Sequence, residues 1–388
     1  MDFDTPESTT RFAREVRGIL SDPHTRRLVR AVHERDDGMD GDARDLYRHL
    51  GRSGILAPSW PAEFGGRDAD FTATVALLEE MVRHGIPQSL YYISVQIIGS
   101  LILQAGSEEQ KRRLLPQLAG GELTACVLFT EPEHGSDLAG ITTHAVPDDD
   151  GTGWTINGRK TYNLKSAYAD VALCAVRTDE RQSRYEGLTL FLLPLGDPGV
   201  SVRPLPSLSD EQFHDIGLSG VRAGPEAVVG GVGSGWPLIT RMFAAERNGL
   251  DYYARARHWL ELASERIDRD GRTPSETELG ELARLRAKLE ASRLLACRTL
   301  QSLHSGESDI AQASLAKWHC SETAQEIAWW VFETLGPQVL DPDADPGTLT
   351  LEAAYREAPG LTVSGGASEV LLDIVTGARL LDDVPREG

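Results

Sequence analysis

Three short segments of the sequence hold the side chains that could carry out chemistry. Glu246 stands beside Arg247, which places a proton-accepting carboxylate next to a permanent cation. Residues 130–137 read T-E-P-E-H-G-S-D, a polar turn of hydroxyl, carboxylate and glycine residues. Paired glycines at 365–366 precede Glu369, and such glycines let a backbone approach a ligand closely. Each segment also has a plainer interpretation, namely an exposed helical glutamate, a polar turn and a tight turn.

The regions that must position these segments differ in character along the chain. Residues 1–124 have apolar side chains at helical spacing. Residues 125–235 contain short β-rich runs separated by glycine-containing turns, and residues 236–388 return to helical spacing. The sequence therefore predicts an α+β fold of three domains with these boundaries. They are an N-terminal helical domain, a small middle β-barrel or β-sandwich domain, and a C-terminal domain that resembles a four-helix bundle.

Capping and turn residues predict several element ends. Ser107 before two glutamates, and Thr273 before a proline, each indicate a helix N-terminus. A helix is expected from about 309 to 335, stopping at Gly336. The Asn-Gly pair at 157–158 is expected to form a turn between two strands. The expected β-rich runs are 125–129, 154–156, 171–176, 188–193 and 200–204.

Composition excludes several classes of protein. The 388 residues carry a formal net charge of -20, so the basic face of a nucleic-acid binder is not expected. The four cysteines are far apart, which argues against a disulfide framework or a metal site and favours a reduced, cytoplasmic setting. The acidic, polar start is not expected to act as a secretory signal. No apolar run approaches the ~18 residues of a membrane span.

Five motifs occur in an order that one enzyme family shares. They are W-P-A-E-F-G-G at 60–66, G-S-E-E-Q-K at 106–111, the polar turn at 130–137, G-G-V-G-S-G-W at 230–236, and E-R at 246–247. Together they resemble the acyl-CoA dehydrogenase family over nearly the whole chain. The E-R pair resembles the branch whose catalytic glutamate lies on the helix after the β domain.

The resemblance implies an FAD-dependent oxidoreductase that dehydrogenates an acyl thioester, on CoA or on a carrier protein, between its α and β carbons. A carboxylate would remove the α proton while flavin N5 accepts the β hydride, and burial should raise the pKa of that carboxylate. The implied FAD contacts are Val127, Phe129, Thr130, Gly135, Ser136, Tyr162, Leu164, Arg269, Arg272, Gly336, Ala367 and Glu369. The implied substrate contacts are Ser136, Arg247, Gly365 and Gly366.

Members of the family place the catalytic glutamate at one of two positions. One is a late loop, where Gly365 stands here at the usual glutamate position. The other is on the helix after the β domain, where Glu246 matches, so Glu246 is expected to be the base. Glu369 is the rival carboxylate, although its family counterpart faces the flavin. Arg247 is expected to face the substrate or to pair with an acid on its own helix.

Three departures from the family pattern weaken the binding of FAD that the resemblance implies. Leu164 stands where a hydroxyl usually meets flavin N5, a loss of about 1–3 kcal/mol unless Asn163 substitutes through a register shift. The R-x-x-F-G motif that reaches a neighbouring subunit's FAD is absent, which leaves Arg269 or Arg272. The Q-x-x-G-G adenosine motif reads E-T-L-G-P here, with Gly336 retained.

These departures leave several functional hypotheses open. The chain could bind FAD by itself, or it could be a half-site or non-catalytic subunit of a heteromeric dehydrogenase. It could also use the same fold as a flavin-dependent oxygenase or hydroxylase. The implied partners are an acyl thioester and an electron-transfer flavoprotein or another acceptor. A homodimer, a homotetramer or a heteromer is expected, because the family's FAD site crosses a subunit interface.

Overall fold

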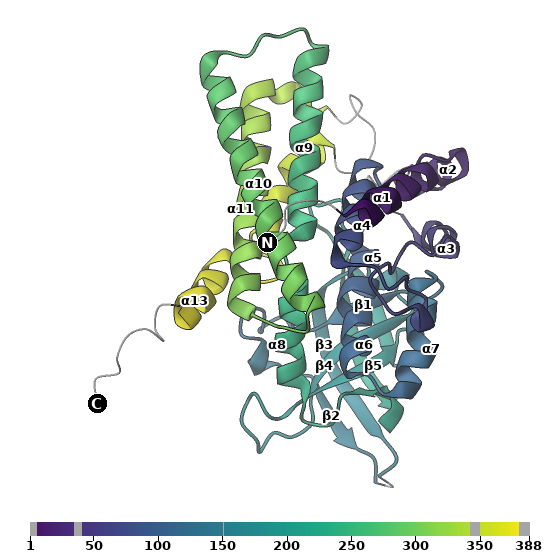
Figure 1. Cartoon of the computed structure of the whole chain (residues 1–388). Helices are drawn as coiled ribbons and strands as arrows, with labels where there is room; N and C mark the ends of the chain where they lie inside the picture. The colour runs from purple at the N-terminus through teal and green to yellow at the C-terminus, as the bar shows by residue number, and fades with distance from the viewer. Residues whose placement is uncertain (1–5, 35–40, 150, 342–349, 380–388) are drawn as a thin grey trace.

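The computed structural model of the protein describes residues 6–34, 41–149, 151–341 and 350–379. N-terminal helices, a middle β sheet and long C-terminal helices follow one another along the chain, which confirms the predicted α+β fold class. In Figure 1 the sheet lies below the long C-terminal helices, and the N-terminal helices lie along one side. No helix in these ranges is long and apolar enough to cross a bilayer.

The N-terminal helices begin at capping residues. Ser107 caps α7 as predicted, because its Oγ accepts from the backbone N–H of Gln110 while the Gln110 side chain accepts from the Ser107 N–H. Asp70 caps α4 through the backbone of Thr72. The π-helix η2 packs against both β1 and α8, so it supports two parts of the predicted site. The bounds are α1 Glu7–Leu20, α2 Pro23–His33, α3 Arg44–Arg52, η1 Ala62–Phe64, α4 Phe71–Arg83, α5 Ser89–Tyr91, η2 Tyr92–Gly99, α6 Ser100–Ala105 and α7 Glu108–Ala119.

The middle domain is one eight-stranded sheet in the order β6-β7-β3-β2-β4-β5-β8, with β1 paired in parallel to β4. Each predicted run overlaps a strand, whereas β2, β7 and β8 lie outside the predicted runs. The predicted turn at 157–158 is wrong, since β3 continues through it. A Cβ on Gly158 would lie 2.3 Å from Oγ1 of Thr143, so this glycine permits a close approach within the sheet. The bounds are β1 Ala125–Leu128, η3 Leu138–Gly140, β2 His144–Pro147, β3 Trp154–Leu164, η4 Ser166–Tyr168, β4 Val171–Arg177, β5 Leu188–Pro194, β6 Val200–Leu205, β7 Phe213–Ala223, η5 Pro225–Ala227 and β8 Val228–Val229.

The C-terminal helices surround α11, which packs against α8, α9, α10, α12 and α13. Asp309 caps α11 and the helix ends before Gly336, as predicted. The cap of α10 is Ser275 rather than Thr273, because Ser275 forms a capping box with Glu278. The bounds are α8 Gly235–Glu246, α9 Leu250–Arg269, α10 Glu276–His304, α11 Ile310–Leu335, η6 Pro337–Leu340, α12 Leu351–Leu361 and α13 Ser368–Arg379.

A buried arginine joins the three parts of the fold. Arg255 of α9 forms salt bridges of 3.0–3.2 Å with three carboxylates. These carboxylates belong to Glu211, Asp251 and Glu357. Glu211, in the middle domain, also accepts a hydrogen bond from Ser89 of α5. Burial acts to lower the pKa of Arg255, but the carboxylates raise it above its ordinary value. The network therefore ties α9 to the sheet and to the N-terminal helices.

Candidate active site

A buried ion pair holds the start of the predicted flavin loop after β1. Glu131 is 4% exposed, and its carboxylate accepts from Nζ of Lys160 at 2.9 Å. It also accepts from the backbone N–H groups of Thr142 at 2.7 Å and Thr143 at 2.8 Å. Lys160 of β3 is fully buried and donates a second hydrogen bond to the carbonyl of Phe129. Burial would raise the pKa of Glu131, but Lys160 and the hydrogen bonds hold it at about 2.

Beyond this ion pair the loop presents an open surface. Val127 and Thr130 are half-buried, and Gly135 and Ser136 are exposed, while Phe129 lies buried behind them. Within the described residues, the backbone N–H groups of Gly135 and Ser136 donate no hydrogen bond. The loop thus offers accessible donors to a bound group that carries acceptor atoms.

A β-bulge near the end of β3 completes this surface. The register of β3 on β7 shifts between Lys160 and Asn163, and Tyr162 adopts φ 53° with its side chain 68% exposed. The side-chain amide of Asn163 donates to the carbonyl of His214, so it serves the sheet. Leu164 is half-buried. The register shift allowed for Asn163 therefore exists, although its amide is engaged within the domain.

Glu246 is the last residue of α8, where the helix direction breaks. Gly249 between α8 and α9 has φ 86°, and a Cβ there would lie 2.7 Å from Sγ of Cys320. The amide of Asn248 donates to the hydroxyl of Tyr92 in η2. A tight glycine turn and a buried side-chain hydrogen bond thus fix the end of α8, and with it the position of Glu246.

Three predicted segments converge at this helix end. Phe243, one turn before Glu246, lies 6.3 Å from Phe129 between ring centroids. The Arg247 guanidinium lies 4.3 Å above the Phe243 ring. Nε of Arg247 donates to the carbonyl of Gly365 at 2.8 Å. The end of β1, the Glu246–Arg247 pair and the paired glycines therefore meet.

The paired glycines lie close to the Glu246–Arg247 pair, with little room for a side chain at either position. A Cβ on Gly365, where φ is 66°, would lie 3.4 Å from Oε1 of Glu246 and 3.1 Å from Oη of Tyr252. A Cβ on Gly366, where φ is 111°, would lie 3.0 Å from the Arg247 guanidinium. Both the backbone angles and the close approach require glycine.

Burial and charge compete at the Glu246 carboxylate. Burial raises the pKa of Glu246, while the positive charges of Arg247 and Lys317 oppose that rise. Burial likewise lowers the pKa of Arg247 from its ordinary value, and lowers that of Lys317 to about 8. Burial, together with the charge of Glu246, raises the pKa of Tyr252. A carboxylate of raised basicity that faces an accessible loop can act as a general base.

The remaining predicted FAD contacts lie apart from this cluster. Arg269 ends α9 and Arg272 follows in the α9–α10 turn, both exposed, and Arg272 pairs with a carboxylate at 2.8 Å. In Figure 1 this turn lies at the end of the long helices that is far from the sheet. Gly336 follows α11 with φ 77°. Ala367 and Glu369 lie at the start of α13, half-buried and exposed respectively.

The residues of the flavin loop and of the β3 bulge fit one part of an FAD molecule. The exposed Tyr162 ring offers a stacking surface, and the free N–H groups of Gly135 and Ser136 suit the acceptor atoms of a flavin. The surface near β1 and β3 therefore fits the flavin ring. Arg269 and Arg272, the predicted partners of its pyrophosphate, lie on the distant turn of the same chain.

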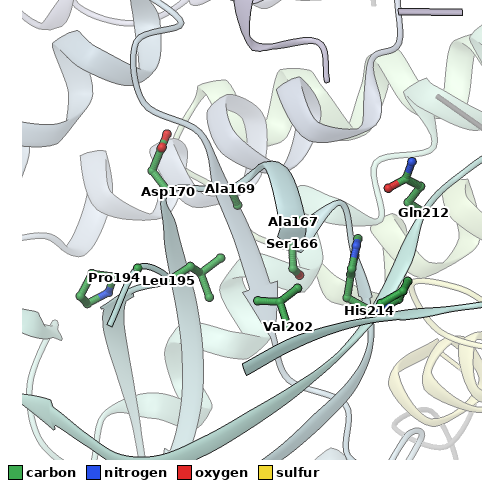
Figure 2. Close-up of a pocket in the computed structure, with 11 residues that line it drawn as sticks. Ser166, Ala167, Ala169, Asp170, Pro194, Leu195, Val202, Gln212 and His214 are labelled. Atoms are coloured by element: carbon green, nitrogen blue, oxygen red, sulfur yellow. The ribbon is translucent and has the colours of Figure 1, made fainter. Parts of the chain in front are cut away.

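A cavity of about 810 Å³ lies elsewhere in the middle domain. Figure 2 shows its lining, in which polar side chains such as Ser166, Gln212 and His214 alternate with apolar ones such as Val202 and Leu195. None of the predicted site residues lines it. The cavity is thus separate from the Glu246 cluster.

Two buried lysines of the site were not predicted as site residues. Lys160 lies in the G-R-K segment that precedes the bulge, and Lys317 is the only lysine or arginine in α11. A lone cation in a helix rich in alanine is a signal that the sequence does offer, because lysine is rarely buried without a partner. Tyr252, one turn beyond the break after α8, carries no comparable signal.

The comparisons with known proteins agree over the whole architecture. Models of the acyl-CoA dehydrogenase N-terminal, middle and C-terminal domains match residues 7–122, 126–219 and 233–380. The acyl-CoA dehydrogenase FadE26 of Mycobacterium tuberculosis (strain ATCC 25618 / H37Rv) is 30% identical over 385 residues, which cover 95% of each chain.

Two solved structures of complexes resemble this chain closely. The Tcur3481-Tcur3483 steroid ACAD is 28% identical with a TM-score of 0.85, and the match covers 97% of this chain and 98% of the other. The ChsE4-ChsE5 complex from Mycobacterium tuberculosis is 28% identical with a TM-score of 0.84, and the match covers 100% of both chains. The chain belongs to the acyl-CoA dehydrogenase family, and is accordingly an FAD-dependent oxidoreductase that acts on CH–CH groups.

Proposed function

We propose that this chain catalyses the α,β-dehydrogenation of an acyl thioester, with Glu246 as the base that removes the α proton. The observation that carries the proposal is the enclosure of the Glu246 carboxylate by the Gly365 turn, Arg247 and Lys317. Bound FAD would supply the acceptor for the β hydride. Glu369 is a weaker candidate, because its side chain is exposed at the start of α13.

The proposed base works through the balance of burial and charge around it. The α proton of a thioester is weakly acidic, so a carboxylate with a raised pKa removes it more effectively than an ordinary one. The flanking cations favour the ionised form of the same carboxylate, and so limit the rise of its pKa. Activity should therefore appear as the pH rises through the raised pKa of Glu246.

The other predicted residues would hold cofactor and substrate around this base. Val127, Thr130 and Tyr162 would contact the flavin ring, with Gly135 and Ser136 offering backbone donors. Ser136, Arg247, Gly365 and Gly366 would border the thioester. Because one nitrogen of Arg247 already binds the Gly365 carbonyl, we assign Arg247 a share in shaping the turn as well. Dehydrogenation is favoured over an oxygenase reaction, which needs no such base.

A second subunit is proposed to complete the pyrophosphate end of the FAD site. Arg269 and Arg272 lie on the turn far from the flavin loop, where they would reach the cofactor of a neighbouring subunit. A homo-oligomer would supply them, and so would a heteromer like the two similar complexes. Mass photometry of the purified protein, alone and with candidate partner chains, distinguishes the two assemblies.

Purified protein tests the proposal directly. We expect a yellow protein that releases FAD, identified by mass, and that reduces a dye acceptor when given an acyl-CoA thioester. The probes are butanoyl-CoA, octanoyl-CoA and a steroid side-chain CoA thioester. Glu246→Gln should lower turnover by about 10²–10⁴-fold and keep its flavin, while the matched variant Glu369→Gln keeps turnover. A Glu246→Gln enzyme with normal turnover would rule out this base.

A further inference from the structure

Lys317 is a buried lysine beside the proposed base. It forms no salt bridge within the described residues, although a buried charge usually has one. Lys317 of α11 is fully buried, and within the described residues it pairs directly with no carboxylate. Its Nζ donates instead to two backbone carbonyls, of Leu361 at 2.8 Å and of Gly366 at 2.9 Å. A buried cation without an ionic partner costs free energy, and a neutral donor could bind the same carbonyls. The charge of Lys317 is instead favoured from a distance, by the Tyr252 ring 5.3 Å from Nζ and by the carboxylates of Glu246 and Glu322.

Lys317 and Glu246 lie on either side of the turn that contains Gly365. A Cβ on Gly365 would lie 3.9 Å from Cε of Lys317 and 3.4 Å from Oε1 of Glu246, so these two side chains flank the same glycine. Lys317 and Arg247 bind successive carbonyls of the turn, those of Gly366 and Gly365 respectively. Two cations from separate helices thus hold the turn against one carboxylate.

We propose that Lys317 is a positioning residue, whose ammonium both holds the 361–366 turn and keeps Glu246 ionised for proton abstraction. This proposal rests on the proposed function, in which Glu246 is the base. Lys317 touches neither Glu246 directly nor a predicted cofactor residue, so it acts through charge and through the turn. With a pKa of about 8, it is mostly protonated at pH 7.

The other groups around Glu246 cannot replace this charge. Arg247 is the second cation, but it already binds the Gly365 carbonyl and stacks on Phe243. The hydroxyls of Tyr252 from α9 and of Tyr92 from η2 are neutral, because burial raises the pKa of both. Glu322 of α11 favours the charged form of Lys317, and binds Ser368. Among the described residues, therefore, only two positive charges oppose the rise in the pKa of Glu246 that burial causes.

The test compares pH profiles of kcat/KM for the holoenzyme with octanoyl-CoA, or with whichever probe is turned over. Lys317→Met and Lys317→Gln remove the charge, Lys317→Arg retains it, and Lys288→Met removes a half-exposed lysine of α10 as a matched control. We expect the acid limb to move up by about one pH unit in the two neutral variants, and to stay in place in the other two. Deuterium uptake at the thioester α carbon in D2O, measured by mass spectrometry, follows proton removal separately from reduction of the acceptor.

The outcomes separate this inference from the function on which it rests. Normal turnover by Glu246→Gln would contradict the proposed function itself. An inactive Glu246→Gln, combined with an unshifted acid limb in both neutral Lys317 variants, would leave that function standing and overturn the role of Lys317. If both neutral variants fail to fold while Lys317→Arg folds, the role of the lysine is structural, and this result also contradicts the proposed role of Lys317.

Discussion

Replacement of Glu131 by glutamine should destabilise the protein strongly. The Glu131 carboxylate, 4% exposed, accepts hydrogen bonds from the ammonium of Lys160 and from the backbone of residues 142 and 143. A glutamine amide offers one acceptor and places an NH2 group against one of these donors. It also leaves the ammonium of Lys160 buried without its counter-charge. Breaking a buried pair on one side costs about 3–5 kcal/mol of the free energy of unfolding.

The pKa of Glu131 gives a second measure of the same interaction. It lies at about 2 in the folded protein against an ordinary value of 4.5, which corresponds to about 3 kcal/mol at neutral pH. Because the folded-state pKa is lowered, this stability is fully present above pH ~4.5. It is lost as the pH falls from there towards 2. Both arguments therefore lead us to expect a cost of at least about 3 kcal/mol.

Denaturant unfolding at pH 7 checks this value. The matched control is Lys111→Met, which breaks a pair of nearly the same length, 3.0 Å, with the exposed Glu108, and should cost less than about 1 kcal/mol. The double variant Glu131→Leu/Lys160→Met should recover part of the loss, because neither charge then remains buried alone. Flavin content should fall in Glu131→Gln as the loop loosens. If Glu131→Gln costs no more than Lys111→Met, the ion pair does not hold the loop as argued.

Three further variants test the glycine turn after α8 and the junction around Arg255. Gly249→Ala should destabilise the protein by about 2 kcal/mol or more, because φ is 86° and the new Cβ would lie 2.7 Å from Sγ of Cys320. Gly280→Ala, in α10 with open space around it, should instead stabilise by up to about 1 kcal/mol, and thermal unfolding that ranks the two alike would contradict this account. Arg255→Met should cost about 3 kcal/mol or more in denaturant unfolding, since it removes a buried cation that three carboxylates share, although Glu211 keeps Lys165. A neutral effect would show that the junction tolerates this loss.

Features that depend on a few neighbouring residues could be predicted from the sequence. The cap at Ser107 and the end of α11 before Gly336 follow from residues within one helical turn, so the sequence indicates them directly. The bounds of β3 do not follow in this way. The Asn-Gly pair at 157–158 has the chemistry of a turn, and only the approach of Thr143 shows why a glycine is needed inside a strand.

The buried lysines show a deeper limit on prediction from one sequence. Lys160 is 29 residues from Glu131, and Lys317 is 44 residues from Leu361. Helical or strand periodicity reports which face of an element a residue occupies, but it does not report a partner on another element. Whether a lysine is solvated or buried depends on that partner, because burial of the charge is costly without it. The sequence therefore indicated the Glu246–Arg247 pair, but it did not indicate Lys317, the second cation near this carboxylate.

Both lysines hold a wall of the proposed site through backbone carbonyls. Lys160 in β3 binds the carbonyl of Phe129 beside the proposed flavin loop, and Lys317 in α11 binds that of Gly366 beside the proposed base. Each donor sits on a regular element whose own position is set by extensive packing, whereas each acceptor belongs to a loop or turn. A loop that is hydrogen-bonded to such an element is held as rigidly as the element itself. The flavin loop is thus held from β3, and the glycine turn against Glu246 is held from α11, so both loops are anchored to regular elements.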